Sequence, residues 1–333
     1  MRKLLAGLTA VVSIAASSLT NAAEERTVCI YDPLGSSGPM YNLMTEYRNF
    51  AIQNGYNFEL KPYTDEKIAS DDFKAGQCDA VVMTGARARP YSKFASTIEA
   101  IGAVPNASIM RKLVMAISAP GAAKYMSNDR YEVGGVIPAG PIYLFVNDRS
   151  IDTVEEMSGK RIATLDYDAP SIKMVNHIGA AVVPSNSANF SGKFNNGSVD
   201  IAYAPALAYE PLEMYKGLGT KGGILRYNLA YLDFQLVMHK EKFTSEFMQA
   251  SRSFVATLFD KAAAGVAKYT EAIEEKYWID LPPADVAGYN EMLRQVRVVL
   301  RDEGVYDGKM LKLLKNLRCK ETPSAAECAE SLE

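Results

Sequence analysis

The stretch I-D-T-V-E-E-M-S-G-K-R-I-A-T-L-D-Y-D, residues 151–168, opens the block of sequence that decides the fold. Short apolar segments at 161–165, 180–183 and 199–203 are typical of buried strands. Pro170 predicts a helix after the first of them, because proline loses no hydrogen bond at the first position of a helix. Strands that alternate with helices indicate a parallel sheet.

Polar and aromatic residues follow the ends of these predicted strands. In open parallel sheets, ligands bind beyond the carboxyl ends of the strands. We therefore expect one edge of a ligand cleft to consist of Asp166, Tyr167, Asp168, Tyr203 and Pro205.

The first 22 residues have the pattern of a secretory signal peptide. Arg2 and Lys3 precede an apolar run at 4–16, and the small-residue site Thr20-Asn21-Ala22 predicts cleavage after Ala22. We expect export to the periplasm. No later stretch is apolar for 18 residues, so we expect no direct membrane insertion.

Length and composition indicate two globular domains. The chain has 333 residues, of which 48% are hydrophobic and 23% are charged. Removal of Arg2 and Lys3 takes the formal net charge from −3 to −5. This mildly acidic balance argues against nucleic acid as a partner.

Four cysteines predict two disulfides in an exported protein. Cys29 and Cys78 each open a predicted strand of the same half, and Cys319 and Cys328 are close in sequence. We predict the pairs Cys29–Cys78 and Cys319–Cys328. A zinc site is the alternative, although neither histidine is near a cysteine in sequence.

The N-terminal half repeats the pattern of strand, loop and helix. A strand at 27–31 runs into a Gly/Ser loop, which offers backbone N–H groups to an anion or is a plain turn. A strand at 78–83 is followed by two arginines, whose planar forks suit carboxylate or phosphate. Structural ion pairs with Asp32 or Asp79 are the alternative. The candidate ligand-binding residues here are Tyr31, Asp32, Ser36, Ser37, Thr84, Arg87 and Arg89.

The rest of the chain indicates a division into two lobes. Residues 112–118 are predicted to form a strand, and helices are predicted from residue 244 onward. The segment at 133–148, with apolar strand residues at 142–146, and the segment at 226–238 are interpreted as two crossings between lobes. We predict lobe one at 23–140 plus 239–333, lobe two at 141–238, and a hinge between them that closes a cleft.

Motifs of catalysis are missing from the sequence. Its two histidines, His177 and His239, belong to no H-E-x-x-H motif, and there is no G-x-S-x-G or P-loop. Asp166 with Asp168 is a pair suited to acid–base work, to binding a cation or hydroxyls, or to capping the next helix. We expect no enzyme activity, cofactor or metal.

The chain resembles the periplasmic solute-binding proteins of TRAP-type transporters, the DctP-like group. The resemblance rests on T-V-E-E-M-S-G-K-R-I-A-T at 153–164, G-A-A-V-V-P at 179–184 and K-F-N-N-G-S-V-D-I-A-Y-A-P at 193–205. The blocks at 29–39 and 72–89 resemble a narrower AdeT-like subgroup, some of whose members are labelled as RND-type efflux components linked to aminoglycoside resistance. The resemblance implies two α/β lobes of a type II-like periplasmic binding fold, C-terminal helices, a ligand cleft and a membrane transporter as partner.

One position departs from the family pattern. Members typically carry a ligand-binding arginine in a G-x-K-I-R run, whereas Ala163 stands at that place here. Arg161 lies on the same strand face but about 6–7 Å along it. We therefore expect Arg161 in the site and a small polar solute with hydroxyl or amine groups. The alternatives are an accessory protein of RND-type efflux, which the lack of sustained heptads disfavours, and an exported enzyme.

Overall fold

The computed structural model describes residues 23–330 and 332–333. The predicted signal peptide and its cleavage site lie outside these residues. Among the helices of the described part, none combines the length and the apolar character that crossing a membrane requires.

A mixed sheet of ten strands runs through the described chain. Its strands are β1 (Glu24–Tyr31), β2 (Tyr56–Tyr63), β3 (Ala80–Thr84), β4 (Tyr131–Val146), β5 (Arg161–Leu165), β6 (Ala181–Ser185), β7 (Ile201–Pro205), β8 (Gly223–Leu225), β9 (Ala230–His239) and β10 (Trp278–Ile279). The main order is β2-β1-β3-β9-β4-β7-β5-β6, and β8 joins β10 to β4. We call β2-β1-β3 with the neighbouring part of β9 and β4 the first half, and β7-β5-β6 with β8 and β10 the second half.

Each half contains the parallel arrangement that the sequence predicts. In the first half β1 is parallel to both β2 and β3, and in the second half β5 is parallel to both β6 and β7. The strands β4 and β9 run antiparallel to their neighbours, which makes the sheet mixed. Parallel strands bring their carboxyl ends to one edge, where the loops that follow them meet.

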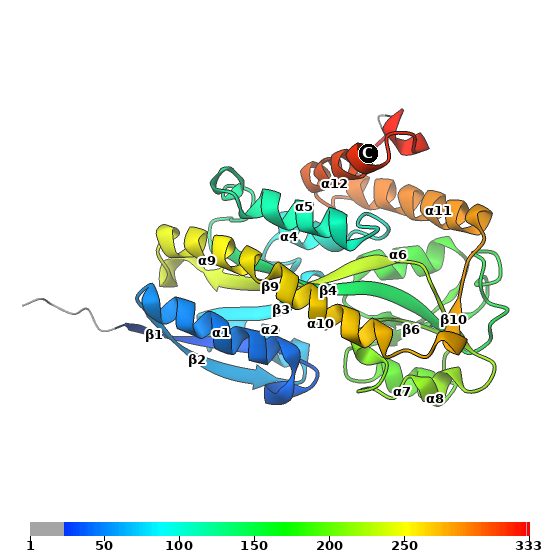
Figure 1. Cartoon of the computed structure of the whole chain (residues 1–333), viewed down its shortest axis with the longest axis horizontal. Coiled ribbons are helices and arrows are strands. Elements are labelled where there is room, and N and C mark those ends of the chain that lie inside the picture. The colour runs from blue at the N-terminus through cyan, green and yellow to red at the C-terminus, as the bar shows by residue number, and fades with distance from the viewer. Residues whose placement is uncertain (1–22, 331) are drawn as a thin grey trace, which may run out of the picture.

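The strand β4 connects the two halves. Its residues 131–142 pair with β9, and its residues 142–146 pair with β7. The predicted crossing segments therefore fall on β4 and β9, which run side by side through the middle of the molecule (Figure 1). A strand shared by two halves holds them together while leaving a boundary between their loops.

Helices cover both halves of the sheet (Figure 1). The longer ones at the C-terminal end include α11, which lies next to α12 beside the second half. The helices are α1 (Pro39–Gln53), α2 (Glu66–Lys74), α3 (Gly85–Ala88), α4 (Lys93–Ser96), α5 (Ala107–Ser118), α6 (Ala169–His177), α7 (Phe190–Asn195), α8 (Tyr215–Leu218), α9 (Ser245–Thr257), α10 (Phe259–Glu271), α11 (Pro283–Asp302) and α12 (Gly308–Glu321).

Glycines in β4 allow α9 and α10 to pack directly on the sheet. The pairing of β4 with β9 shifts register between Val133 and Gly135, and a Cβ at Gly135 would lie 2.6 Å from Val255 of α9. At Gly140, where φ is +101°, a Cβ would collide with Val266 of α10. Only glycine permits both this backbone conformation and this close approach.

The prediction of a strand at 112–118 was wrong, because these residues belong to the helix α5. Asn106 caps the helix by accepting a hydrogen bond from the N–H of Ile109 at 2.9 Å. The buried positions Ile109, Leu113 and Ile117 repeat every four residues, which is the spacing of one helix face.

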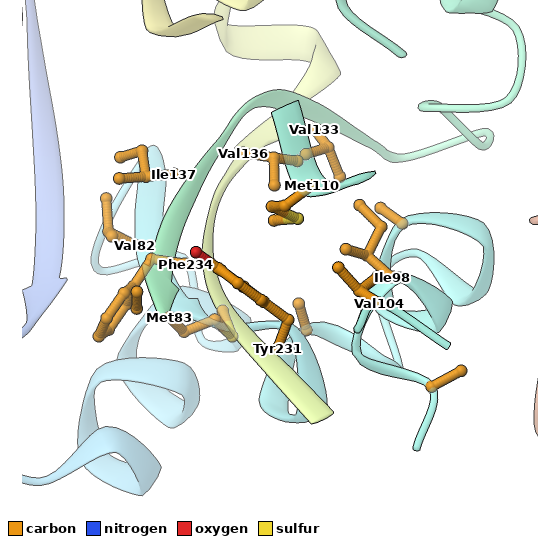
Figure 2. Close-up of a cluster of buried hydrophobic side chains, with 14 of the residues drawn as sticks. Val82, Met83, Ile98, Val104, Met110, Val133, Val136, Ile137, Tyr231 and Phe234 are labelled. Atoms are coloured by element: carbon orange, nitrogen blue, oxygen red, sulfur yellow. The ribbon is translucent and has the colours of Figure 1, made fainter. Parts of the chain in front are cut away.

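The core is built mainly from the branched and aromatic residues of β3, β4 and β9 with the helices above them. Figure 2 shows Val82 and Met83 of β3, Val136 of β4 and Tyr231 of β9 within one such cluster. A second cluster in the second half packs Tyr143 of β4 against other buried side chains. The strand ends that carry the predicted site residues therefore extend from a well-packed core.

Both predicted disulfides are confirmed. Cys29 bonds to Cys78, and Cys319 bonds to Cys328. The first bond ties β1 to the segment that enters β3, and the second ties the end of α12 to the C-terminal segment. All four cysteines are thus in disulfides, which removes the zinc alternative.

The C-terminal region departs from the predicted division into lobes. That division placed every residue after 238 in lobe one. The short strand β10 instead pairs with β8 in the second half, and Trp278 packs edge-on against Tyr143 at 5.0 Å between ring centroids. The chain therefore passes between the halves more often than the two predicted crossings.

Candidate functional site

A cavity of about 150 Å³ lies where the two halves of the sheet meet. Its walls include the carboxyl-terminal residues of β1, β3, β5 and β7, as expected for a site at the ends of parallel strands. The lining residues are Tyr31, Pro33, Leu34, Glu66, Thr84, Ala86, Arg89, Glu99, Ile101, Ile142, Ala163, Leu165, Tyr167, Asp168, Pro170, Ser171, Ser187, Phe190, Tyr203, Ala204, Pro205, Leu207, Ala208, Pro211, Leu212, Leu229, Ala230, Leu232 and Phe234.

The structure brings seven of the predicted site residues together around this cavity. They come from both halves of the sheet and from segments far apart in the sequence. These seven are Tyr31, Thr84, Arg89, Tyr167, Asp168, Tyr203 and Pro205.

An aromatic and ionic contact joins the halves beside the cavity. The hydroxyl of Tyr167, from the second half, donates to Glu66 Oε2 of the first half at 2.9 Å. The guanidinium of Arg87 lies over the Tyr167 ring, 3.3 Å from its centroid, and Arg87 Nε is 3.6 Å from Glu66 Oε2. Burial, together with the charge of Glu66, raises the pKa of Tyr167 well above its ordinary value. The tyrosine therefore stays neutral and keeps its proton for this bond.

An ion pair between the halves lies in the cavity wall itself. Arg89 Nη2 is 3.4 Å from Asp168 Oδ1, and the hydroxyl of Ser171 donates to Asp168 Oδ2. Asp168 is buried, with 8% of its surface exposed. Arg89 Nη1 is also buried and makes no hydrogen bond within the described chain. One donor of this arginine therefore remains for a bound molecule.

Tyr203 supports the second wall of the site. Its hydroxyl accepts a hydrogen bond from the backbone N–H of Leu165 at 2.9 Å, which joins the ends of β7 and β5. Burial raises the pKa of Tyr203, so the hydroxyl remains protonated. Tyr203 thereby fixes the loop that carries Tyr167 and Asp168.

The predicted anion site in the Gly/Ser loop is already filled by a side chain of the protein. The buried carboxylate of Asp32 accepts hydrogen bonds from the N–H groups of Leu34, Met40 and Tyr41 at 2.9, 2.8 and 3.2 Å. A Cβ at Gly38 would collide with this carboxylate, so glycine is required there. Burial raises the pKa of Asp32, although the three N–H groups oppose that shift. Asp32 thus caps α1 instead of lining the cavity.

Four other predicted site residues lie outside the cavity lining. Ser36, Ser37 and Asp166 have exposed side chains. Arg87 lies behind Tyr167, and its acidic partner is Glu66 rather than Asp32 or Asp79. These residues lie at the predicted edge of the sheet, but their side chains do not line the cavity.

Arg161 also lies away from the cavity, because it begins β5 whereas the cavity contacts the end of that strand. Leu165 lies four positions further along the strand than Arg161, which is roughly 13 Å at the usual rise. Arg161 Nη2 instead donates to Asp200 Oδ1 at 2.7 Å on an exposed part of the surface. This pairing lowers the pKa of Asp200 to about 2. The expectation that Arg161 contacts the ligand has no support in this geometry, whereas Ala163 lines the cavity.

Two cavity carboxylates were missed in the sequence. Glu66 Oε1 accepts the N–H of Thr84 at 2.8 Å. Glu99 accepts the N–H groups of Gly85, Ala86 and Asp233 at 3.0, 2.7 and 3.0 Å. A signal for Glu99 exists, since it is an isolated acid in the apolar run I-E-A-I-G-A.

Asp233 is a third acid that the sequence analysis did not single out. Asp233 belongs to β9, and its backbone N–H contacts Glu99 from the segment before α5. None of the surface of Asp233 is exposed. Burial raises the pKa of Asp233 to about 8, and burial with the neighbouring Asp233 raises the pKa of Glu99 well above its usual range. The pair therefore carries less than two negative charges at neutral pH. An acid within a mostly apolar strand is the sequence signal that could have identified Asp233.

The fold and the cavity define a class, the two-lobed solute-binding proteins. The structure is similar to the TRAP periplasmic solute-binding protein of Desulfovibrio salexigens solved with orotic acid, with a TM-score of 0.73, 13% identity, and coverage of 89% of this chain and 99% of that one. It is equally similar to one from Ochrobactrum anthropi whose C-terminus occupies the ligand-binding pocket, with a TM-score of 0.73, 14% identity, and coverage of 93% and 99%. The predicted fold class is thereby confirmed.

Sequence comparison gives the family. The model of the family "Solute-binding protein AdeT 1/2" matches residues 49–333. The chain is 40% identical over 300 residues to the probable solute-binding protein AdeT1 of Acinetobacter baumannii, covering 90% of this chain and 99% of the relative. AdeT2 of the same organism is 25% identical over 231 residues, covering 69% and 97%. The chain belongs to the AdeT 1/2 solute-binding protein family, and is a solute-binding protein rather than an enzyme.

Proposed function

We propose that this protein captures a small organic solute in the cavity between its halves, in the periplasm, and delivers it to a TRAP-type membrane transporter. The observation that carries the proposal is the cavity at the carboxyl ends of β1, β3, β5 and β7, with walls from both halves. Structures with this fold hold small organic acids, among them orotic acid and, in the protein from Shewanella oneidensis, succinate. Export through a cleaved signal peptide ending at Ala22 belongs to the same proposal.

Closure of two lobes around the solute is the second part of the proposal. Lobe one comprises residues 23–140 plus most of 239–333, and lobe two comprises 141–238 with β10 added. The contacts Tyr167–Glu66 and Arg89–Asp168 would form on closure and break on opening. The hinge would lie in β4 and β9, which connect the lobes.

The volume of the cavity favours a solute about as large as a single-ring compound. A cavity of about 150 Å³ holds benzene in another protein, and this cavity has a similar volume. A multi-ring aminoglycoside is much larger than this space. The volume therefore disfavours such an antibiotic as the solute of this closed form.

Solute capture from a cell extract tests the proposal. Protein freed of ligand by unfolding and refolding is incubated with the small-molecule fraction of its native cells, washed, and analysed for released compounds by mass spectrometry. Leu232→Trp fills the cavity, and Ile52→Trp is the matched control on an exposed position of α1. We expect the wild type and Ile52→Trp to enrich the same compound and Leu232→Trp to lose it. Equal enrichment by all three proteins, or by none, would contradict the proposal.

A further inference from the structure

The charged groups of the cavity lining already have partners within the protein. Its lining contains three carboxylates, those of Glu66, Glu99 and Asp168, but a single guanidinium, that of Arg89. The nearby Arg87 is covered by Tyr167 and is not part of the lining. Glu66 pairs with Arg87 and Asp168 pairs with Arg89, so an anionic ligand would find no guanidinium without an acidic partner.

The cationic group of the lining already has an acidic partner. Arg89 pairs with Asp168 at 3.4 Å, and both residues are largely buried. A ligand carboxylate that approached Arg89 would have to lie beside the Asp168 carboxylate as well. Like charges at such short range in a buried site are unfavourable.

The carboxylates of the lining also have partners within the protein, so they are poor binding groups for a cationic ligand. Glu66 accepts from the Thr84 N–H and the Tyr167 hydroxyl. Glu99 accepts three backbone N–H groups. A cation that lost its hydration on entering would meet carboxylate oxygens that already accept hydrogen bonds from the protein.

Most of the remaining wall is apolar. Leu232 and Phe234 of β9 line the cavity, together with Leu229 just before that strand and Leu165 at the end of β5. Such a surface binds the hydrocarbon part of a ligand by excluding water. Against this wall, the buried Arg89 Nη1 stands out as a donor without a partner in the described chain.

We propose that the solute is an uncharged, largely apolar small molecule whose single oxygen acceptor, of the carbonyl or ether kind, receives a hydrogen bond from Arg89 Nη1. This inference rests on the proposed function and names the chemical class of its solute. It differs from the organic acids that similar folds hold.

Matched acid and amide probes test the charge preference. Benzamide and benzoate, and cyclohexanecarboxamide and cyclohexanecarboxylate, have nearly the same shape within each pair and differ in charge at pH 7.5. We expect calorimetry to show each amide binding at least tenfold more tightly than its acid. An acid that binds as tightly as its amide would overturn the inference.

Two aspartate variants show whether the preference comes from the occupied arginine. In Asp168→Asn, Arg89 loses its acidic partner, so the amide preference should fall below threefold. Asp166→Asn is the matched control, because Asp166 lies two residues away with an exposed side chain outside the lining. It should keep the preference of the wild type. An unchanged preference in Asp168→Asn would overturn the assignment to Arg89.

The solute recovered from the protein separates this inference from the proposed function. Protein purified from its own periplasm is unfolded, and the released molecule is analysed by mass spectrometry. An uncharged compound supports both proposals. A carboxylate or phosphate overturns the inference and leaves the solute-binding function standing. If nothing is released and no probe binds, the proposed function fails, and the inference fails with it.

Discussion

The hydroxyl of Tyr167 donates a hydrogen bond to Glu66 Oε2 across the boundary between the two halves, at 2.9 Å. The guanidinium of Arg87 covers the same tyrosine ring, 3.3 Å from its centroid. These two contacts, with the Arg89–Asp168 pair, hold the loops after β3 and β5 against each other. If the protein closes as proposed, the balance between its open and closed forms depends on these few polar groups, and their removal has measurable consequences.

Replacement of Tyr167 by phenylalanine should favour an open form. A hydrogen bond to a charged group contributes about 1.5–3 kcal/mol, so its loss shifts closure at least roughly tenfold toward the open form. We expect a larger radius of gyration in solution scattering without ligand. Tyr63→Phe is the control, because Tyr63 donates to Asp72 at 2.7 Å within the first half. A change in both variants, or in neither, would contradict the role of Tyr167.

Replacement of Arg89 by glutamine should weaken solute binding at least tenfold. The variant loses the donor that we propose binds the solute, and it leaves the buried Asp168 without its cation. Arg161→Gln is the control, since its exposed pair with Asp200 lies outside the cavity. That variant should bind within twofold of the wild type and lose at most about 1 kcal/mol of stability. Weaker binding in Arg161→Gln than in Arg89→Gln would restore the sequence-based assignment of Arg161.

The buried Asp233 makes stability depend on pH. Its pKa is about 8 in the folded protein and about 3.9 in an unfolded chain, so the folded state holds an extra proton between these values. The stability that this proton provides is complete below pH 3.9 and is lost as pH rises through 8. We expect Asp233→Asn, which keeps an oxygen for Gln235, to reduce the fall in unfolding free energy between pH 5 and 8 by up to about 1.4 kcal/mol per pH unit.

Denaturant unfolding at pH 5, 6, 7 and 8 measures this slope. Asp200→Asn serves as control, because the pKa of Asp200 is about 2. The stability that depends on its ionisation is lost only as pH falls from about 4 through 2. The control should therefore keep the slope of the wild type above pH 5. Identical slopes in the wild type and Asp233→Asn would show that Asp233 is ionised in the folded protein.

The two disulfides should differ in their effect on stability. The bond between Cys29 and Cys78 closes a segment with a sequence separation of 49, and the bond between Cys319 and Cys328 one of 9. Loop-closure entropy predicts losses of about 4 and about 3 kcal/mol when each pair is changed to serine. Thermal unfolding should rank the variants in this order. Ligand affinity should remain unchanged in the Cys319→Ser/Cys328→Ser protein, because neither cysteine belongs to the cavity lining.

The parallel strands of each half were accessible from sequence because short apolar runs with clear boundaries predict buried parallel strands. The residues at the ends of those strands, such as Tyr167 and Tyr203, consequently fell at the cavity. At 112–118 the apolar run alone was misleading, and the four-residue repeat from Ile109 was the better signal. Thr153 and Glu156 form the two hydrogen bonds of a capping box, but within a turn instead of a helix.

The contacts that individual side chains make could not be predicted from the sequence. Arg87 lies over Tyr167, 80 positions along the chain, and this contact depends on how the two halves meet. The loop at 33–38 has the pattern of an anion site, yet its neighbour Asp32 occupies the N–H groups. Local sequence predicts which edge of a sheet a residue reaches, whereas the packing of the halves decides what it contacts there.

Small-angle scattering of the wild-type protein, before and after addition of the solute recovered from its periplasm, tests the central claim most directly. The account holds that two lobes joined by β4 and β9 close around a molecule in the cavity between them. We predict a smaller radius of gyration when the solute is bound, with no such change in Leu232→Trp. Superimposable curves for the free and the saturated wild-type protein would contradict the account.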